Sequence, residues 1–188
     1  RSATSGNTFE RHWRTALDKG FIEDTSLPTV IGSVNDSVVL SMVKAPGKAE
    51  DLELILPADM CIYDGRFANL GWLQELPNPV TKLTWDNAAL MNPATMEARG
   101  LNLGDVVELK VGKYMVKAGV FPVPGMDEHT VTLALGWGRG PEAGALANGA
   151  GFNGYTVRSS TAMDIVPGLV VSSTGEDYSF SHTQDHGV

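Results

Sequence analysis

A glycine-rich run at residues 149–154 spells G-x-G-x-x-G, a pattern that lets the backbone approach a pyrophosphate. In dinucleotide-binding proteins a strand precedes this pattern and a helix follows it, so that the helix N-terminus faces the phosphates. Here a loop precedes the run and the strand-like residues 155–157 follow it. This context argues against a Rossmann site. Gly151 could still bring backbone amides close to a ligand, and Asn153 could offer donors and an acceptor, unless the run is a flexible surface loop.

A second glycine-rich run, residues 136–140, places Arg139 between two glycines. A guanidinium has a fork of donors that suits a bidentate contact with phosphate. An ordinary surface arginine on a glycine loop is the alternative interpretation. Arg139 is therefore a candidate phosphate-binding residue.

Side chains that could bind a metal or act in catalysis are few. His182 and His186 are four residues apart, a spacing that on a helix would direct both at one metal, but the surrounding segment has no helical pattern. The single cysteine, Cys61, lies in an apolar run and is interpreted as a buried, inert thiol, because one thiol cannot form an internal disulfide or an iron–sulfur cluster. Asp86 and Asn87 are interpreted as turn formers. We expect no metal site and assign no catalytic residue.

Composition and charge limit the class of protein. The chain has 188 residues, 43% hydrophobic and 19% charged, and its 21 glycines and 10 prolines indicate many turns and a strand-rich globular fold. With a net charge of −8 and no apparent basic face, it is not expected to bind nucleic acid or an anionic membrane surface. No apolar run approaches the roughly 18 residues of a membrane span. The polar start without an initiator Met is typical of a linker and suggests an excised fragment or a processed product.

Two segments have helical patterns. Residues 8–19 place their apolar side chains on one face at a period of 3.6 and predict an amphipathic N-terminal arm. In residues 92–100, Asn92 is a cap, Pro93 stands at the first helical position and Gly100 is a stop.

Strands are expected where β-branched and apolar residues cluster between turn formers. The expected strands are residues 37–43, 52–56, 80–85, 106–111, 114–120, 130–135, 155–157 and 163–171. From Ser172 onward the chain is polar and acidic and is expected to be loose without a partner. The predicted organisation is a linker, helix and sheet extension at 1–50, a barrel domain at 51–175 and a polar tail at 176–188.

The helix at 92–100 and the valine-rich strand after it, residues 92–109 together, resemble the molybdopterin-dinucleotide-binding domain of the dimethyl sulfoxide reductase superfamily. This resemblance implies a mainly β fold, a six-stranded double-psi β-barrel, here with short helices and an N-terminal helical arm. Residues 71–89, together with 9–20 and 183–186, resemble more closely the molybdopterin/iron–sulfur large subunit of alternative complex III.

The resemblance also implies a function. The parent protein would be an oxidoreductase subunit of a respiratory quinol-oxidising complex on the periplasmic side of the bacterial cytoplasmic membrane. The fragment itself would be structural, docking to the rest of its subunit and to other subunits without entering the membrane. Relatives that bind molybdopterin guanine dinucleotide contact it through loops equivalent to those with Asn69, Trp72 and Gln74, and hold the pterin through an Asn placed like Asn153. A Trp72 buried in the barrel interface is the favoured alternative.

In the alternative complex III subunit the pterin site is expected to be degenerate, so the cofactor is expected to be absent, with iron–sulfur clusters only in other parts of the parent. Two alternatives stay open. One is a functional molybdopterin guanine dinucleotide-binding domain of a molybdenum oxidoreductase. The other is a stand-alone double-psi barrel that acts as a binding module or a small enzyme.

Overall fold

The computed structural model describes residues 6–42 and 52–183. The chain divides into two units, Arg1–Pro46 and Gly47–Val188, and each is described by itself. No helix among the described residues has both the length and the apolar character needed to cross a membrane.

The first unit contains two helices. Helix α1, Gly6–Lys19, confirms the predicted arm: Phe9, Trp13 and Leu17 are about half exposed or more along one face, and the Phe9 and Trp13 rings stack with centroids 6.4 Å apart. Helix α2, Asp36–Met42, occupies the segment for which a strand was predicted, so that prediction is wrong.

The cause of the α2 helix is local. Asn35 Oδ1 accepts hydrogen bonds from the Ser37 hydroxyl at 2.6 Å and from the Val38 amide at 3.3 Å, which satisfies part of the first helical turn. No strand lies among the described residues of this unit to pair with the β-branched run. Without a ladder partner, the capped helix satisfies more of the backbone.

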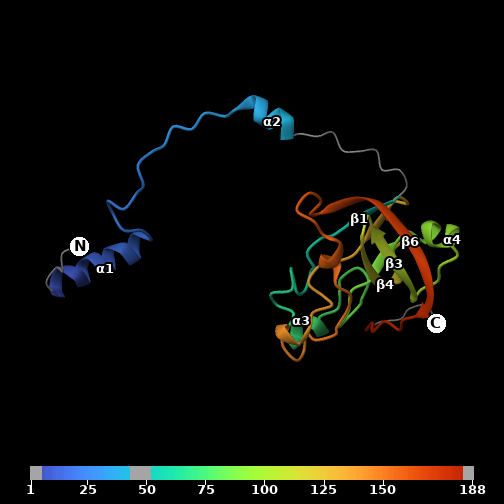
Figure 1. Ribbon diagram of the computed structural model, residues 1–188. Coiled ribbons are helices and arrows are strands. Elements are labelled where there is room, and N and C mark those ends of the chain that lie inside the picture. Colours follow the sequence, from blue (N-terminus) through green and yellow to red (C-terminus); the bar gives the residue numbers. More distant parts are fainter. Residues whose placement is uncertain (1–5, 43–51, 184–188) are drawn as a thin grey trace. The chain divides into compact units, whose positions relative to one another are not determined.

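The second unit is a closed six-stranded barrel (Figure 1). Its strands are β1 Leu52–Ile55, β2 Ala89–Met91, β3 Asp105–Val111, β4 Tyr114–Pro122, β5 Thr130–Thr132 and β6 Ile165–Asp177. They close in the order β1-β5-β2-β4-β3-β6, with β1/β5 and β2/β4 parallel and the other neighbours antiparallel. The two parallel pairs require crossover connections, and the mainly β barrel expected from the resemblance is confirmed.

The barrel interior is filled by aliphatic side chains that alternate along the strands. On β1, Leu52 and Leu54 are buried, and on β3, Val107 and Leu109 are fully buried. The neighbouring strands add Met91, Val120, Val131 and Val166. The interior of the barrel is therefore a packed core.

Helix α4, Pro93–Ala98, confirms the prediction from its cap and stop residues. Asn92 Oδ1 accepts from the Ala94 amide at 2.8 Å, and Gly100 has a φ of 65° at the end. Met96 is buried against the barrel core. The other short helices are α3 Gly71–Glu75, and the 3₁₀ helices η1 Pro141–Ala143 and η2 Gly154–Val157.

Two predicted strands are wrong. In residues 80–85, Lys82 and Trp85 have φ values of 60° and 58°, which no ladder accommodates, and Asn78 Oδ1 caps the turn by accepting from two amides. Residues 155–157 belong to η2, because Asn153 Oδ1 accepts from the Tyr155 amide at 3.0 Å and begins a 3₁₀ turn. Strand β2 was not predicted.

The segment from Ser172 is not loose, contrary to expectation. Strand β6 extends to Asp177, and its residues 170–177 pair with β3. Its side chains are mostly exposed, so the apolar pattern that normally indicates a strand is missing there. The backbone ladder, rather than burial, orders this part.

Candidate functional site

All six predicted binding residues lie in two loops, residues 58–76 and 136–154, that pack on each other beside the barrel. We call these two loops the loop layer. A second hydrophobic cluster lies at their contact, formed by Ile62 and Ala68 from one loop and Trp137 and Ala147 from the other. In Figure 1, α3 of the first loop lies next to the orange segment of the second. The structure therefore brings the predicted residues to one region.

A buried aspartate holds the centre of the loop layer. The Trp137 indole donates to Asp59 Oδ2 at 2.9 Å, while the Cys61 and Ile62 amides donate to Asp59 Oδ1 at 2.8 and 2.9 Å.

Cys61 is half-buried rather than fully buried, and burial raises the pKa of its thiol. A thiol with a raised pKa is a poor nucleophile, in agreement with an inert Cys61.

Asn69 and Gln74 join the two loops to each other. Asn69 Oδ1 accepts from the Leu146 amide at 3.0 Å. The buried Gln74 donates through Nε2 to the carbonyls of Ala68 and Leu146. Gln74 Oε1 is buried and has no hydrogen-bond partner among the described residues. The side-chain amides of Asn69 and Gln74 therefore fasten the first loop to Leu146 of the second.

Gly151 lets other groups pack closely against its backbone, but these groups are the side chains of Asn87 and Trp137. Its φ is 69°, and a Cβ there would lie 2.7 Å from Asn87 Oδ1 and 2.8 Å from Trp137 Cβ. Asn87, 3% exposed, donates to the carbonyls of Ala134 at 2.7 Å and Phe152 at 3.0 Å, and accepts from the Phe152 amide at 2.7 Å. Asn87 thus fastens the glycine-rich run at 149–154 to the segment that follows β5.

Arg139 and Asn153 also contact their own chain. A Cβ on Gly65 would lie 2.8 Å from Arg139 Nη1, so the guanidinium packs against that glycine, and the Arg139 main chain pairs with Asn148. Asn153 Oδ1 caps η2. The backbone of Asn153 packs against Gly138, where a Cβ would lie 2.3 Å from the Asn153 nitrogen.

Trp72 is the exception among the predicted residues, since it is 88% exposed. The favoured interpretation of a buried Trp72 is therefore wrong. Leu76, the residue that caps the C-terminus of α3, donates its amide to the Trp72 carbonyl at 3.1 Å, while Gln74 within α3 is buried. Leu70 and Leu146 are about half exposed, and Leu146 Cδ1 lies 3.4 Å from the Cβ position of Gly71. We call Leu70, Trp72, Leu76 and Leu146 the apolar face of the loop layer.

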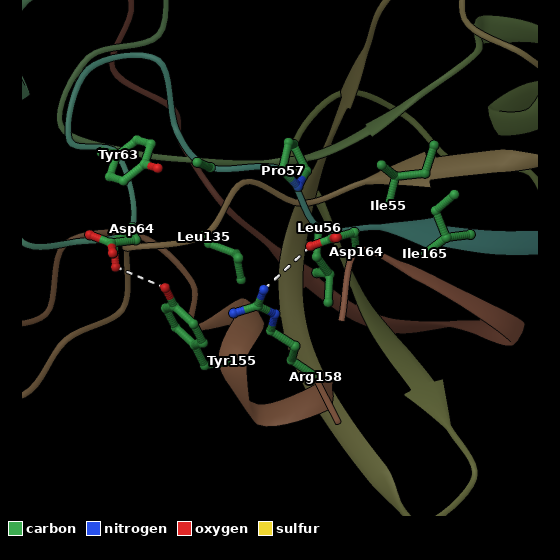
Figure 2. A pocket seen from close by; sticks show the side chains of 11 residues that line it. Ile55, Leu56, Pro57, Tyr63, Asp64, Leu135, Tyr155, Arg158, Asp164 and Ile165 are labelled. Atoms are coloured by element: carbon green, nitrogen blue, oxygen red, sulfur yellow. Dashed lines mark hydrogen bonds and ion pairs between the residues drawn. The ribbon is translucent and has the colours of Figure 1, made fainter. Parts of the chain in front are cut away.

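A cavity of about 420 Å³ lies where the end of β1 meets the loop layer and the start of β6 (Figure 2). Its walls include Leu56, Leu135 and other apolar side chains. At its rim the Tyr155 hydroxyl donates to the Asp64 carbonyl at 2.9 Å, and Arg158 lies 3.3 Å from Asp164. The volume is within the range of small-molecule sites.

The charged groups around this cavity are paired. Arg66 donates to the Asp64 carboxylate, which lowers the pKa of Asp64 to about 2, and the Arg66 guanidinium lies over the Tyr63 ring at 5.1 Å. Arg158 Nε donates to the Met163 carbonyl at 2.7 Å. The rim therefore presents no unpaired cation to attract an anion.

Sequence reasoning missed the importance of Asp86 and Asn87, which are more than turn formers. Asp86 is 8% exposed, and its Oδ2 accepts from the Tyr178 hydroxyl at 2.6 Å. The partners of the two side chains lie 47 to 92 positions away along the chain, so no local pattern could have indicated them. The spacing of His182 and His186, at which we expected no metal site, is not tested because His186 lies outside the described residues.

The likeness of this chain to known proteins is structural. No protein-family model and no curated protein matches the chain. Among solved structures, acetylene hydratase from Pelobacter acetylenicus is similar over 86% of this chain, with 16% sequence identity and a TM-score of 0.41. The chain spans 22% of the length of that structure. No functional conclusion rests on a likeness of this size.

Proposed function

We propose that this chain is a double-psi barrel module of a molybdopterin oxidoreductase-like subunit in a respiratory quinol-oxidising complex. In this proposal the barrel serves as a structural and docking unit and its pterin site is degenerate. The proposal rests on the resemblance of residues 92–109 and 71–89 to those proteins, together with the closed barrel and the geometry of the loop layer.

The observation that carries the docking role is the apolar face of the loop layer. Trp72 is 88% exposed, and Leu70, Leu76 and Leu146 of the same loop layer are each about half exposed. Residues 67–81 contain one charged side chain, Glu75, in a chain with 36 charged residues. A large exposed aromatic side chain with apolar neighbours and few charges fits the centre of a protein–protein interface. We propose another part of the parent complex, with a similarly uncharged apolar surface, as its partner.

The bonding inside the loop layer supports a degenerate pterin site. Asn69 and Gln74 bind the backbone across the two loops, Asn153 binds the backbone of its own loop, and the space beside Gly151 is occupied by Asn87 and Trp137. These residues fit a pterin dinucleotide poorly, because Asn69 Oδ1, Gln74 Nε2 and Asn153 Oδ1 are already bonded to the backbone. No step of electron transfer is assigned to this chain, and any iron–sulfur clusters would lie in other parts of the parent. The proposed location is the periplasmic side of the cytoplasmic membrane.

Replacing Trp72 by alanine is expected to weaken docking without weakening the fold. An aromatic side chain at the centre of an interface typically contributes about 2–4 kcal/mol to binding, which corresponds to roughly 30- to 1,000-fold in Kd. Because the side chain is so exposed in this chain, the free energy of unfolding should change by no more than about 0.5 kcal/mol. The measurement is titration of the partner subunits with the wild-type and Trp72→Ala proteins.

Tyr114→Ala is the matched control, since Tyr114 is an aromatic residue, about half exposed, on the β3–β4 hairpin. This variant should bind like the wild type. Equal affinity of the Trp72→Ala and wild-type proteins for all partner subunits would contradict the docking role of this face.

The cavity in Figure 2 favours a second candidate function, a cofactor-loaded domain of a molybdenum oxidoreductase. In that case part of a molybdopterin guanine dinucleotide would occupy the cavity between Tyr63 and Arg158. The paired state of Arg158 and Asp64 makes this the weaker proposal, because a phosphate would have to displace existing contacts.

A further inference from the structure

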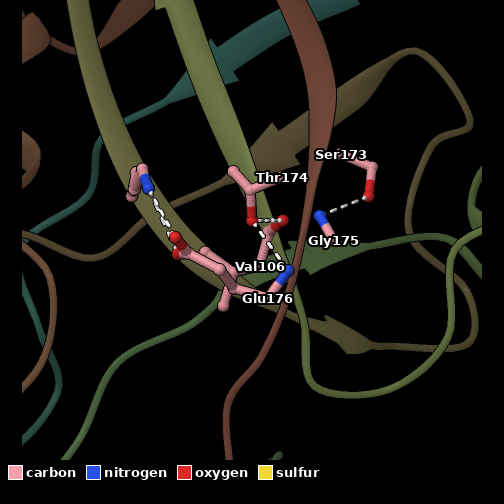
Figure 3. Close-up of polar contacts among 6 residues, drawn as sticks. Val106, Ser173, Thr174, Gly175 and Glu176 are labelled. Carbon is pink, nitrogen blue, oxygen red and sulfur yellow. Dashed lines mark hydrogen bonds and ion pairs between the residues drawn. The ribbon is translucent and has the colours of Figure 1, made fainter.

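The C-terminal segment of the described chain, residues 178–183, leaves β6 and packs across the side of the barrel. We call this segment the strap. The end of β6 is fixed before the strap begins: the Thr174 hydroxyl donates to the Val106 carbonyl at 2.8 Å, and Lys117 pairs with Glu176 at 3.0 Å (Figure 3). Any motion of the strap therefore has its hinge after Glu176.

Backbone hydrogen bonds fasten the strap at several points. The Tyr178 amide donates to the Gly104 carbonyl at 2.8 Å, the Thr84 amide donates to the Ser181 carbonyl at 2.9 Å, and the Thr183 amide donates to the Lys82 carbonyl at 3.2 Å. These partners belong to loops rather than to a strand of the barrel. The strap can therefore open without breaking the closed sheet.

Aromatic rings fill the space beneath the strap. The Tyr178 ring meets Phe152 edge to face at 4.9 Å and Phe180 at 5.1 Å, and Phe180 meets Phe121 at 5.7 Å. Gly119 provides room for this, since a Cβ there would lie 2.7 Å from the Phe180 ring. Opening the strap would uncover Phe121 and Phe152, an aromatic surface on the barrel.

A buried carboxyl lies at the centre of these contacts. Asp86 Oδ2 accepts from the Tyr178 hydroxyl at 2.6 Å, while Oδ1 is buried and has no hydrogen-bond partner among the described residues. Burial raises the pKa of Asp86 to about 6, although the hydrogen bond from Tyr178 opposes the rise. Burial and the Asp86 carboxyl together raise the pKa of Tyr178, so its hydroxyl remains the donor.

We propose that Asp86 and Tyr178 form a proton-sensitive clip, which holds the strap most firmly when the Asp86 carboxyl is neutral. A buried carboxylate with one unpartnered oxygen is costly, and protonation removes that cost. When the strap opens, Asp86 gains water and ionises as an ordinary aspartate. The clip thus couples exposure of the aromatic surface to the local proton concentration.

The sign of the effect follows from the two pKa values. An exposed aspartate has a pKa of about 3.9, whereas that of Asp86 under the closed strap is about 6. The closed strap therefore binds a proton more tightly than the open one. The stability that this proton adds to the closed strap relative to the open strap is fully present below about pH 4. It is lost between about pH 4 and 6, and above about pH 6 it is absent. A difference of about two pKa units allows roughly a hundredfold change in the opening equilibrium.

Other charged groups lie near the clip, among them Asp177, which precedes Tyr178, and Asp105, which lies opposite Asp177 in the β3/β6 ladder. On β6, Glu176 forms an ion pair with Lys117. In the loop that contains Asp86, Lys82 donates to the Pro79 carbonyl. Residues 150–154, next to Tyr178, contain no charged side chain. His182 lies on the strap itself, so a His182 variant is tested separately.

Hydrogen–deuterium exchange of the full chain tests the clip through the amides of Thr84, Tyr178 and Thr183. Their protection factors, corrected for the intrinsic pH dependence of exchange, should fall up to about a hundredfold between pH 4 and 7.5. The Leu133 amide, which donates to Ile55 within the barrel, should fall much less. In Asp86→Asn the protection at the strap should not change with pH, and His182→Gln should behave like the wild type.

Three results would overturn the proposal. The protection factors of the strap amides could be independent of pH in the wild type, they could fall with pH in Asp86→Asn as much as in the wild type, or they could fail to fall with pH in His182→Gln. If Asp86→Asn does not fold, the carboxyl carbon of Asp86 can be titrated by NMR in the wild-type chain. A midpoint near 6 supports the clip, and a midpoint near that of an exposed aspartate contradicts it.

Discussion

Replacing Asn87 by alanine is expected to lower the free energy of unfolding by about 3–4 kcal/mol, the largest loss expected from a polar residue of this chain. The side chain, 3% exposed, makes three hydrogen bonds at 2.7 to 3.0 Å to the backbone of Ala134 and Phe152. Alanine would leave these backbone groups without partners in a partly buried position, at about 1–3 kcal/mol each when no water replaces the amide. Chemical denaturation should show a lower midpoint with an unchanged slope.

The matched control is Asn102→Ala, because the Asn102 side chain is exposed. This variant should change stability by no more than about 0.5 kcal/mol. If both asparagine variants lost the same small amount, Asn87 would not fasten the glycine-rich run to the segment that follows β5 as described.

Gly151→Ala is expected to destabilise the chain by about 3 kcal/mol or more. A left-handed alanine costs about 1–2 kcal/mol by itself, and the new Cβ would lie 2.7 Å from Asn87 Oδ1 and 2.8 Å from Trp137 Cβ. Asn87 and Trp137 are both buried and cannot move without breaking their hydrogen bonds. The measurement is again the midpoint of chemical denaturation.

Gly149→Ala separates the two causes. Gly149 also has a positive φ, 78°, but a Cβ there would meet nothing within 4 Å. Its loss should be limited to the conformational cost of about 1–2 kcal/mol. Equal losses in the two variants would show that the space beside Gly151 is open, as a ligand site would require.

The parts of the fold that could be predicted from the sequence are those specified by neighbouring residues. In residues 92–100, the N-cap, the first-turn proline and the stop glycine all act within one helix. At Gly112, the turn connects two strands, β3 and β4, that are neighbours in the sequence and pair with each other. Strand β2 has three residues and no alternation long enough to recognise. Residues 80–85 alternate like a strand, but the left-handed Lys82 and Trp85 bond to residues outside this segment. The Lys82 carbonyl accepts from the Thr183 amide, and the Trp85 amide donates to the Gln74 carbonyl.

The candidate binding residues stay a prediction, but the structure shows what their side chains contact. The resemblance indicated Asn69 and Gln74, the glycine-rich run at 149–154 indicated Asn153, and all three lie in the loop layer. Residue type alone cannot distinguish an amide that binds a ligand from one that binds the backbone of another loop, since both need the same donors and acceptors. For Trp72 the ordinary burial of tryptophan gave the wrong expectation, because exposure depends on the tertiary position of α3.

We propose that the loop layer folds onto itself and does not hold a pterin. The most direct test is elemental analysis of the full-length parent protein, purified natively, together with fluorescence of any oxidised pterin released on denaturation. We expect no stoichiometric molybdenum or tungsten and no pterin fluorescence. About one metal atom per chain with a released pterin dinucleotide would contradict it.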